Sequence, residues 1–346
     1  MSLQKLIRFS DAKLAAISLC ILSPIIAEYL LGIWSLMQLS SLLFLVPFYG
    51  CGALLVREIA RRSGSGWVGI FALSFAFGLI EEGLLTQTFF NTDYYHAGLL
   101  SFGYIESLGT SPFWIIYVLG LHSLGSICLP ILMVELRLDS SEREKLWLNW
   151  PSFFVCTTLY FVASASIFLG TQQAFPYQST LLQKLAVITV MIAFSALALI
   201  RPKIAFKASN KRVSNLKVFI TTIILGVVFF GQHYHMYTLG LSEHFVAFSM
   251  LSAYLLGMYF MLRWSQCANW SDSQQYSMVF SLLVIYSVLG LYQFSKYTTA
   301  LGHSINYVDI ALQVGLILAL TIPVLKRLSR LFKNAKKACL PQTEKM

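Results

Sequence analysis

The sequence predicts an all-α membrane protein, a polytopic bundle of about 10 transmembrane helices with its N and C termini in the cytoplasm. Three observations support this prediction: the composition, the number of long apolar segments and the distribution of basic residues. Of 346 residues, 57% are apolar and 12% are charged, and the mean hydropathy is +0.69. These values lie far outside the range of soluble globular chains.

Apolar windows of about twenty residues, the length that crosses a hydrocarbon core of roughly 30 Å, recur along the whole chain. They cover residues 13–33, 36–57, 66–90, 112–135, 152–171, 181–200, 216–235, 243–263, 275–295 and 303–325. Basic residues precede the first window, as in a signal peptide, but no small-residue cleavage site follows, so we interpret it as a retained helix. We expect a single integral membrane domain over residues 1–346 that includes a basic cytoplasmic tail at 327–346.

The basic residues fall almost entirely on one side of this map. When alternate connections are counted, 23 of the 25 lysines and arginines lie on the side of the two termini, and only Lys184 and Lys296 lie on the other. Cytoplasmic loops carry such an excess of basic residues, which predicts cytoplasmic termini and a bacterial cytoplasmic membrane as the location. All six cysteines also map to the cytoplasmic half, where thiols stay reduced.

The net charge of +10 follows mainly from this topology. Because the basic residues are spread over several inner loops, we do not expect nucleic-acid binding. The predicted partners are the lipid bilayer and, for the basic tail that follows Lys326, anionic lipid headgroups. The oligomeric state is left open.

Two adjacent carboxylates, Glu81 and Glu82, lie inside the third apolar segment. Ionisable groups at membrane depth are costly and are usually kept for a function. All six histidines map to the outer half, as do Glu28, Glu81 and Glu82. At a rise of 1.5 Å per residue, Glu82 lies about 12 Å below the outer end of its segment and His122 about 15 Å below the start of the next. The two side chains are therefore expected to meet.

The helix face on which Glu82 is predicted to lie also supports a contact with His122. Steps of four residues through the third segment give Ser74, Gly78, Glu82 and Thr86, a small and polar stripe suited to a contact between helices. Glu81 is turned by about 100° onto the next face. The candidate catalytic residues are thus Glu81, Glu82 and His122, with Glu82 as the stronger of the two carboxylates.

Several kinds of chemistry fit these residues. Glu82 and His122, at one depth, can position water and remove its proton, with Glu82 as the general base of an intramembrane hydrolase. They can also relay protons in a transporter. With His233 or His235 added, they can ligate a divalent metal, which is the cofactor that this set of side chains suggests.

The paired glutamates and the helix-borne His122 about forty positions later resemble the CAAX-protease and bacteriocin-processing (immunity-type) family of intramembrane proteases. The resemblance covers about residues 66–135. It implies that Glu81 and Glu82 activate water and that His122 assists the oxyanion of an intramembrane peptidase.

The family's motifs are two glutamates followed four residues on by arginine, a phenylalanine four residues before a histidine, and a later histidine four residues before asparagine or aspartate. Here Thr86 stands at the arginine position and Val118 at the phenylalanine position. The histidine that follows His122 along the chain is His233, which lies farther away than the third motif usually does.

Two other functions remain open. Ten helices can form two inverted sets of five, as in secondary transporters. Broken helices near a substrate site are suggested by Pro24 with Glu28 in the first segment and by Pro47 with Gly50 and Gly52 in the second. A proton-coupled transporter would then use Glu28, Glu82 and His122. Alternatively, the protein is a non-catalytic membrane scaffold or immunity-type protein, in which the buried polar groups only tie helices together.

Two connections have distinctive compositions. Residues 91–111 form the longest outward loop, and their aromatic side chains suit either an interfacial belt or a lid over Glu82 and His122. Residues 137–150 mix both charges and predict a short surface helix on the cytoplasmic side.

Overall fold

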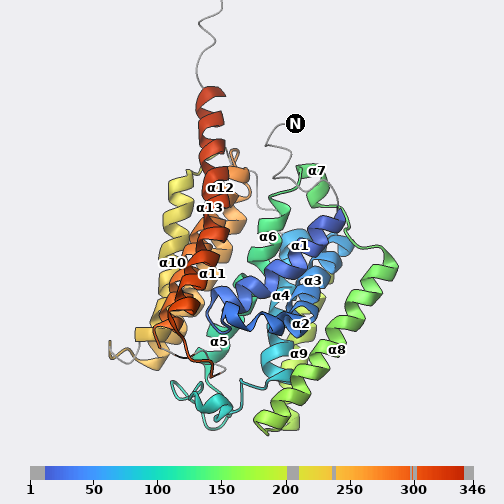
Figure 1. Cartoon of the computed structure of the whole chain (residues 1–346), viewed down its shortest axis with the longest axis vertical. Helices are drawn as coiled ribbons and strands as arrows, with labels where there is room; N and C mark the ends of the chain where they lie inside the picture. Colours follow the sequence, from blue (N-terminus) through green and yellow to red (C-terminus); the bar gives the residue numbers. More distant parts are fainter. Residues whose placement is uncertain (1–11, 201–209, 236–238, 297, 299–301, 339–346) are drawn as a thin grey trace, which may run out of the picture.

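The structure is a computed structural model that describes residues 12–200, 210–235, 239–296, 298 and 302–338. These residues form a bundle of α-helices without an extended β-strand (Figure 1). They contain 10 helical spans that are long and apolar enough to cross a membrane. The predicted all-α transmembrane bundle is confirmed. The start of α1 and the end of α13 lie at the same end of the bundle, here called the terminal end. The opposite end is called the loop end.

Five spans supply most of the buried interior, with 50–72% of their most apolar windows buried. The first span consists of α1 (Ala12–Pro24) and η1 (Ile25–Leu30), and the second of η2 (Leu36–Ser41), α2 (Leu42–Leu45), η3 (Val46–Gly50) and α3 (Cys51–Ser63). The third consists of α4 (Gly66–Leu79) and η4 (Ile80–Leu85), and the fourth of α5 (Pro112–Gly120), η6 (Leu121–Cys128) and α6 (Leu129–Glu135). The fifth is α12 (Asp272–Phe294).

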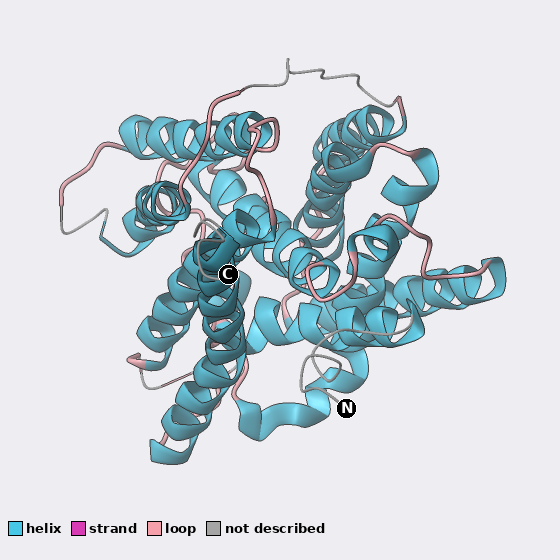
Figure 2. Cartoon of the chain, turned by 90° about the horizontal axis from the view of Figure 1, so that it is seen from above, coloured by secondary structure: helices cyan, strands magenta, loops and turns pink. Residues whose placement is uncertain are grey.

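The other five spans bury only 11–22% of these windows. They are α8 (Trp150–Ala174), α9 (Leu181–Leu199), α10 (Asn215–His235), α11 (Glu243–Trp264) and α13 (Tyr307–Ala338). Their apolar side chains point largely outward, which suits helices that face lipid. Figure 2, seen from above, shows how the helices are arranged around the bundle.

Local sequence signals explain several helix ends. The Asn149 side chain accepts a hydrogen bond from Ser152 N (2.9 Å) and begins α8, with proline at its first turn. Thr180 and Gln183 form a capping box at the start of α9. Gly64 adopts φ +71° directly after α3, where an L side chain would be strained. Side-chain caps and left-handed glycines are the usual terminators of helices.

Three predicted segments have ends that differ from the structure by more than three residues. The segment predicted over 36–57 continues to Ser63. The segment predicted over 66–90 ends at Leu85, because Gln87 adopts φ +57° and the chain folds back over the helix end. The last span starts at Tyr307 instead of residue 303 and continues to Ala338. At 1.5 Å per residue this helix is about 48 Å long, more than a bilayer core requires. The predicted tail therefore begins as a continuation of α13, and residues 339–346 lie outside the described part.

The structure also describes the two connections of distinctive composition, 91–111 and 137–150. A short helix, α7 (Ser140–Arg143), lies between α6 and α8, as the charge pattern predicts. In the 91–111 loop, Phe102 is buried and packs against Phe113 with ring centroids 5.2 Å apart, whereas Tyr95 and Tyr104 remain exposed. The loop thus combines an exposed aromatic rim with a part that closes the loop end of the bundle.

Candidate active site

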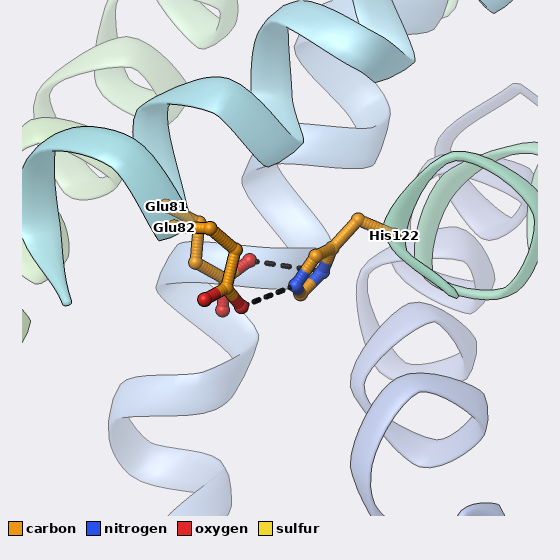
Figure 3. A group of neighbouring side chains, drawn as sticks. All are labelled: Glu81, Glu82 and His122. Carbon is orange, nitrogen blue, oxygen red and sulfur yellow. Dashed lines mark hydrogen bonds and ion pairs between the residues drawn. The ribbon is translucent and has the colours of Figure 1, made fainter. Parts of the chain in front are cut away.

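Glu81, Glu82 and His122 meet inside the bundle. Figure 3 shows the two carboxylates on one helix and the imidazole reaching toward them from the facing helix. His122 Nε2 lies 2.7 Å from Glu82 Oε1, and His122 Nδ1 lies 3.1 Å from Glu81 Oε2. All three residues are 6–8% exposed. The contact between Glu82 and His122 that helix depth predicted is confirmed, and a carboxylate lies at each ring nitrogen.

The small-residue stripe allows this approach. A Cβ added at Gly78 would lie 3.3 Å from the Cβ of His122, so the two backbones come close there. Glu81 shares the contact although an α-helical wheel turns it onto another face. The reason is that residues Ile80–Leu85 form a π-helical segment, whose wider turn makes neighbouring side chains diverge by less than they do in an α-helix.

Four π-helical segments converge on this site. Each carries at least one side chain of the site: η1 holds Glu28, η3 holds Tyr49, η4 holds Glu81 and Glu82, and η6 holds His122. Well under 1% of residues in globular proteins are π-helical, and π-helical turns occur often at functional sites. Their concentration around one cluster marks this cluster as the functional candidate.

Side-chain hydroxyls from other spans donate hydrogen bonds to backbone carbonyl oxygens in these wider turns. Ser23 Oγ donates to Ser126 O (2.6 Å) and lies 3.1 Å from Tyr49 O, which links η6 to η3. The Tyr286 hydroxyl donates to Leu121 O at the start of η6 (3.1 Å). Buried carbonyls need such partners. The irregular helix geometry is therefore held by tertiary contacts.

Both carboxylate oxygens of Glu82 have partners. Oε1 faces His122, and Oε2 accepts hydrogen bonds from Thr86 Oγ1 (3.2 Å) and from the Thr88 hydroxyl. Thr88 in turn accepts a hydrogen bond from Trp114 Nε1 (3.1 Å). The backbone turn after Leu85 thus places the hydroxyls of Thr86 and Thr88 against Glu82. Their hydrogen bonds fix this carboxylate in one orientation.

Glu81 is different because one of its oxygens is left free. Oε1 accepts a hydrogen bond from the Tyr49 hydroxyl. Oε2 is buried and has no hydrogen-bond partner among the described residues, since His122 Nδ1 lies at ion-pair distance without hydrogen-bond geometry. A buried carboxylate oxygen without a donor costs free energy and calls for an explanation. It is the place in this site where a water hydrogen or a cation fits.

A third carboxylate adjoins the cluster. Glu28 interacts with the Tyr49 hydroxyl and, electrostatically, with His122 and Glu82. It is only half-buried. The site therefore combines three carboxylates from two spans with a single imidazole. Glu28 is more exposed than the other three residues.

The metal-ligand prediction stays a prediction, although three of its residues are close together. One ligand atom from each of Glu81, Glu82 and His122 lies within 4.8 Å of the others, and carboxylate oxygens with imidazole nitrogen suit zinc. His233 and His235 lie in the last turn of α10, but their side chains are outside the described part. Sequence reasoning missed Tyr49 and Thr88, although the Pro47 to Gly50 signal for a broken helix adjoins Tyr49.

Residues 17–332 match the model of a family described as an uncharacterized membrane protein family. The chain belongs to this family. No curated protein and no solved structure matches the chain significantly. The family match agrees with a multi-pass membrane protein and assigns no activity to the Glu and His cluster.

Proposed function

We propose that this protein is an intramembrane hydrolase, a peptidase whose chemistry resembles that of the CAAX-protease and bacteriocin-processing family. The observation that carries the proposal is the free, buried oxygen of Glu81 beside His122. General-base hydrolysis requires a carboxylate that can accept a proton from water, placed next to a group that stabilises the developing oxyanion.

Each residue has a role in this proposal. A water molecule hydrogen-bonded to Glu81 Oε2 attacks the substrate carbonyl carbon and gives its proton to Glu81. The protonated imidazole of His122 stabilises the oxyanion, and Glu82 holds that imidazole in place. The proton on Glu81 passes to the leaving amine as the carbon–nitrogen bond breaks. The base is Glu81 rather than the expected Glu82, because both oxygens of Glu82 already accept hydrogen bonds.

The departures from the family's motifs are compatible with this assignment. Thr86, at the arginine position, donates a hydrogen bond to Glu82 Oε2 and so contributes to orienting that carboxylate. Val118, at the phenylalanine position, is buried in the hydrophobic core one helical turn before His122. Thr86 thus makes a polar contact where the family has a polar residue, and Val118 makes apolar contacts where the family has an apolar one.

The test compares the protein termini present in membranes of cells that express the wild type, Glu81→Gln or His122→Ala at equal levels. Quantitative mass spectrometry should find new termini with the wild type that both variants lack. Glu106→Gln, at an exposed position in the 91–111 loop, is the matched control and should behave as the wild type. An identical set of termini for the wild type and Glu81→Gln would contradict hydrolysis at this site.

One observation favours a second function, proton-coupled transport. Glu28 on η1 adds a carboxylate to the cluster, and the charged side chains come from three different spans. In this case Glu28→Gln should abolish uptake driven by a pH gradient in proteoliposomes. Hydrolysis, which does not use Glu28, should survive the same substitution. The Glu28→Gln variant therefore separates the two functions.

A further inference from the structure

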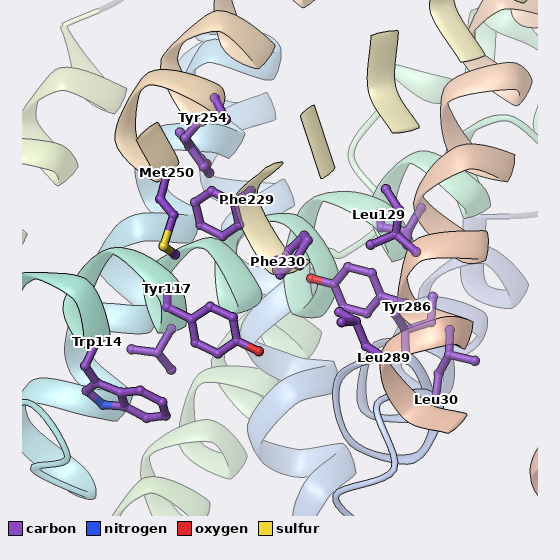
Figure 4. Close-up of a cluster of buried hydrophobic side chains, with 14 of the residues drawn as sticks. Leu30, Trp114, Tyr117, Leu129, Phe229, Phe230, Met250, Tyr254, Tyr286 and Leu289 are labelled. Atoms are coloured by element: carbon purple, nitrogen blue, oxygen red, sulfur yellow. The ribbon is translucent and has the colours of Figure 1, made fainter. Parts of the chain in front are cut away.

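An apolar cavity of about 110 Å³ lies between α4, α6, α10, α11 and α12. Figure 4 shows four of its lining residues, Leu129, Phe229, Phe230 and Tyr254. Almost all of the remaining lining residues are apolar as well, and Thr222 is one of the few that carry a polar atom. Apolar cavities of a similar size, about 150 Å³, stay dry and bind small apolar molecules. The chemistry of this cavity therefore selects a hydrocarbon ligand.

The cavity is elongated along the helices. Trp67 and Trp264 line it at the terminal end, and Tyr254 and Leu124 line it near the middle of the bundle. The ten residues from Tyr254 to Trp264 on α11 correspond to about 15 Å. One turn of a helix, about 10–12 Å across and about 5.4 Å high, exceeds the cavity volume of about 110 Å³ several-fold, so a single alkyl chain suits the cavity better than a helix does.

A basic segment adjoins the terminal end of the cavity. Val213 and Asn269 exchange two hydrogen bonds, from Val213 N (2.9 Å) and to Val213 O (2.8 Å). Val213 and Val218 also pack in one cluster with Trp264. This attachment places the segment 211–217 beside the cavity. Its three cations, Lys211, Arg212 and Lys217, are exposed.

We propose that this cavity binds one alkyl chain of an anionic glycerophospholipid, whose phosphate is bound by the basic segment 211–217. The apolar walls complement the chain, and the cations complement the phosphate. The membrane that surrounds the protein supplies such a molecule. Tyr254 lines the cavity, and its hydroxyl lies 2.8 Å from Ser123 Oγ, so one wall of the cavity contacts the residue next to His122.

Tryptophan fluorescence tests the cavity directly. Phosphatidylglycerol with brominated chains should quench the emission of the detergent-purified protein, because Trp67 and Trp264 line the cavity. Gly257 also lines it, and a Cβ there would meet only Leu225 Cδ1, at 3.9 Å. Gly257→Leu should therefore fill the cavity and weaken the quenching titration roughly tenfold. Gly315→Leu, on α13 with open space around its Cβ, is the matched control and should titrate as the wild type.

Headgroup selection is tested with the same chains on phosphatidylcholine. The wild type should prefer phosphatidylglycerol by roughly tenfold, and the double substitution Arg212→Gln with Lys217→Gln should remove most of this preference. Lys184→Gln, in α9, should keep it. Undiminished quenching in Gly257→Leu would overturn the cavity assignment, and equal wild-type affinity for the two lipids would overturn the phosphate site. Both readouts measure binding, so they stand apart from any hydrolytic activity.

Discussion

Two of the buried clusters of charged side chains in the described part of the chain differ in how completely their polar atoms are paired. The first lies toward the terminal end, where Arg57 is completely buried. Its Nη1 donates to Glu58 (2.7 Å), its Nε to Glu135 (3.0 Å), and its Nη2 to the carbonyl oxygens of Arg143 (2.6 Å) and Lys145 (3.0 Å). Every nitrogen of this guanidinium therefore has an acceptor, and α3 is tied to the connection before α8.

The second cluster, Glu81, Glu82 and His122, has too few donors for its acceptors. Its carboxylate groups outnumber its imidazole, and Glu81 Oε2 accepts no hydrogen bond from the residues that the structure describes. The first cluster is built on regular α-helices and the second on π-helical segments. Buried charges that are fully paired serve the fold, whereas an unsatisfied buried carboxylate in irregular helices is typical of a site kept for chemistry.

The largest expected effect on stability is in the first cluster. Arg57→Met leaves Glu58 and Glu135 without their shared cation, and breaking a buried ion pair costs about 3–5 kcal/mol. Thermal unfolding in detergent measures the loss. Lys145→Met, which removes an exposed cation from the same connection, should change stability by less than about 0.5 kcal/mol. A similar small change for Arg57→Met would show that the two clusters do not differ in the way described.

His122→Ala should destabilise the protein less than Arg57→Met, by about 1–3 kcal/mol. The two glutamates keep their hydrogen bonds to Tyr49 and Thr88 and can take up protons when the imidazole is lost. Cleavage should nevertheless disappear. The comparison uses the same unfolding assay together with the mass spectrometry of protein termini, and retained cleavage would remove His122 from the mechanism.

Tyr49→Phe removes the hydrogen bond to Glu81 Oε1 and leaves the ring packed between its neighbours. We expect a loss of about 1 kcal/mol in stability. Cleavage should fall by roughly tenfold, because Glu81 becomes free to rotate away from its water. Tyr160→Phe is the control, since the buried Tyr160 hydroxyl has no hydrogen-bond partner among the described residues. Equal cleavage rates for Tyr49→Phe and Tyr160→Phe would argue that Tyr49 does not position the base.

The smallest change in stability and the clearest separation of roles should come from Glu81→Gln. The amide keeps an oxygen for Tyr49, and Oε2 accepts no hydrogen bond from any described residue, so the unfolding free energy should shift by less than about 1 kcal/mol. Cleavage should be abolished. Glu135→Gln is the matched substitution in the first cluster and should lower stability more, since Glu135 accepts from both Arg57 and Arg61. Equal losses of stability in the two variants would erase the contrast.

Hydropathy was sufficient to predict the spans because a helix that crosses lipid must be long and apolar whatever its neighbours are. It failed at the end of the third span. Thr86 to Phe90 are as compatible with membrane helix as the residues before them, and only the backbone of Gln87 shows that the chain turns back there.

The sequence alone determined the number of spans and the asymmetry of the basic residues, because these depend on transfer into lipid. It also predicted the contact between Glu82 and His122, although the helix of Glu82 ends earlier than the depth estimate assumed. The tertiary structure decided the roles of the two glutamates. Their hydrogen bonds come from Tyr49, which is distant in sequence, and from Thr88, which reaches Glu82 only because the chain folds back. The direction in which the two glutamate side chains point depends on a π-helical turn that is held by other spans. Neither their hydrogen-bond partners nor this direction can be predicted from the period of a single helix.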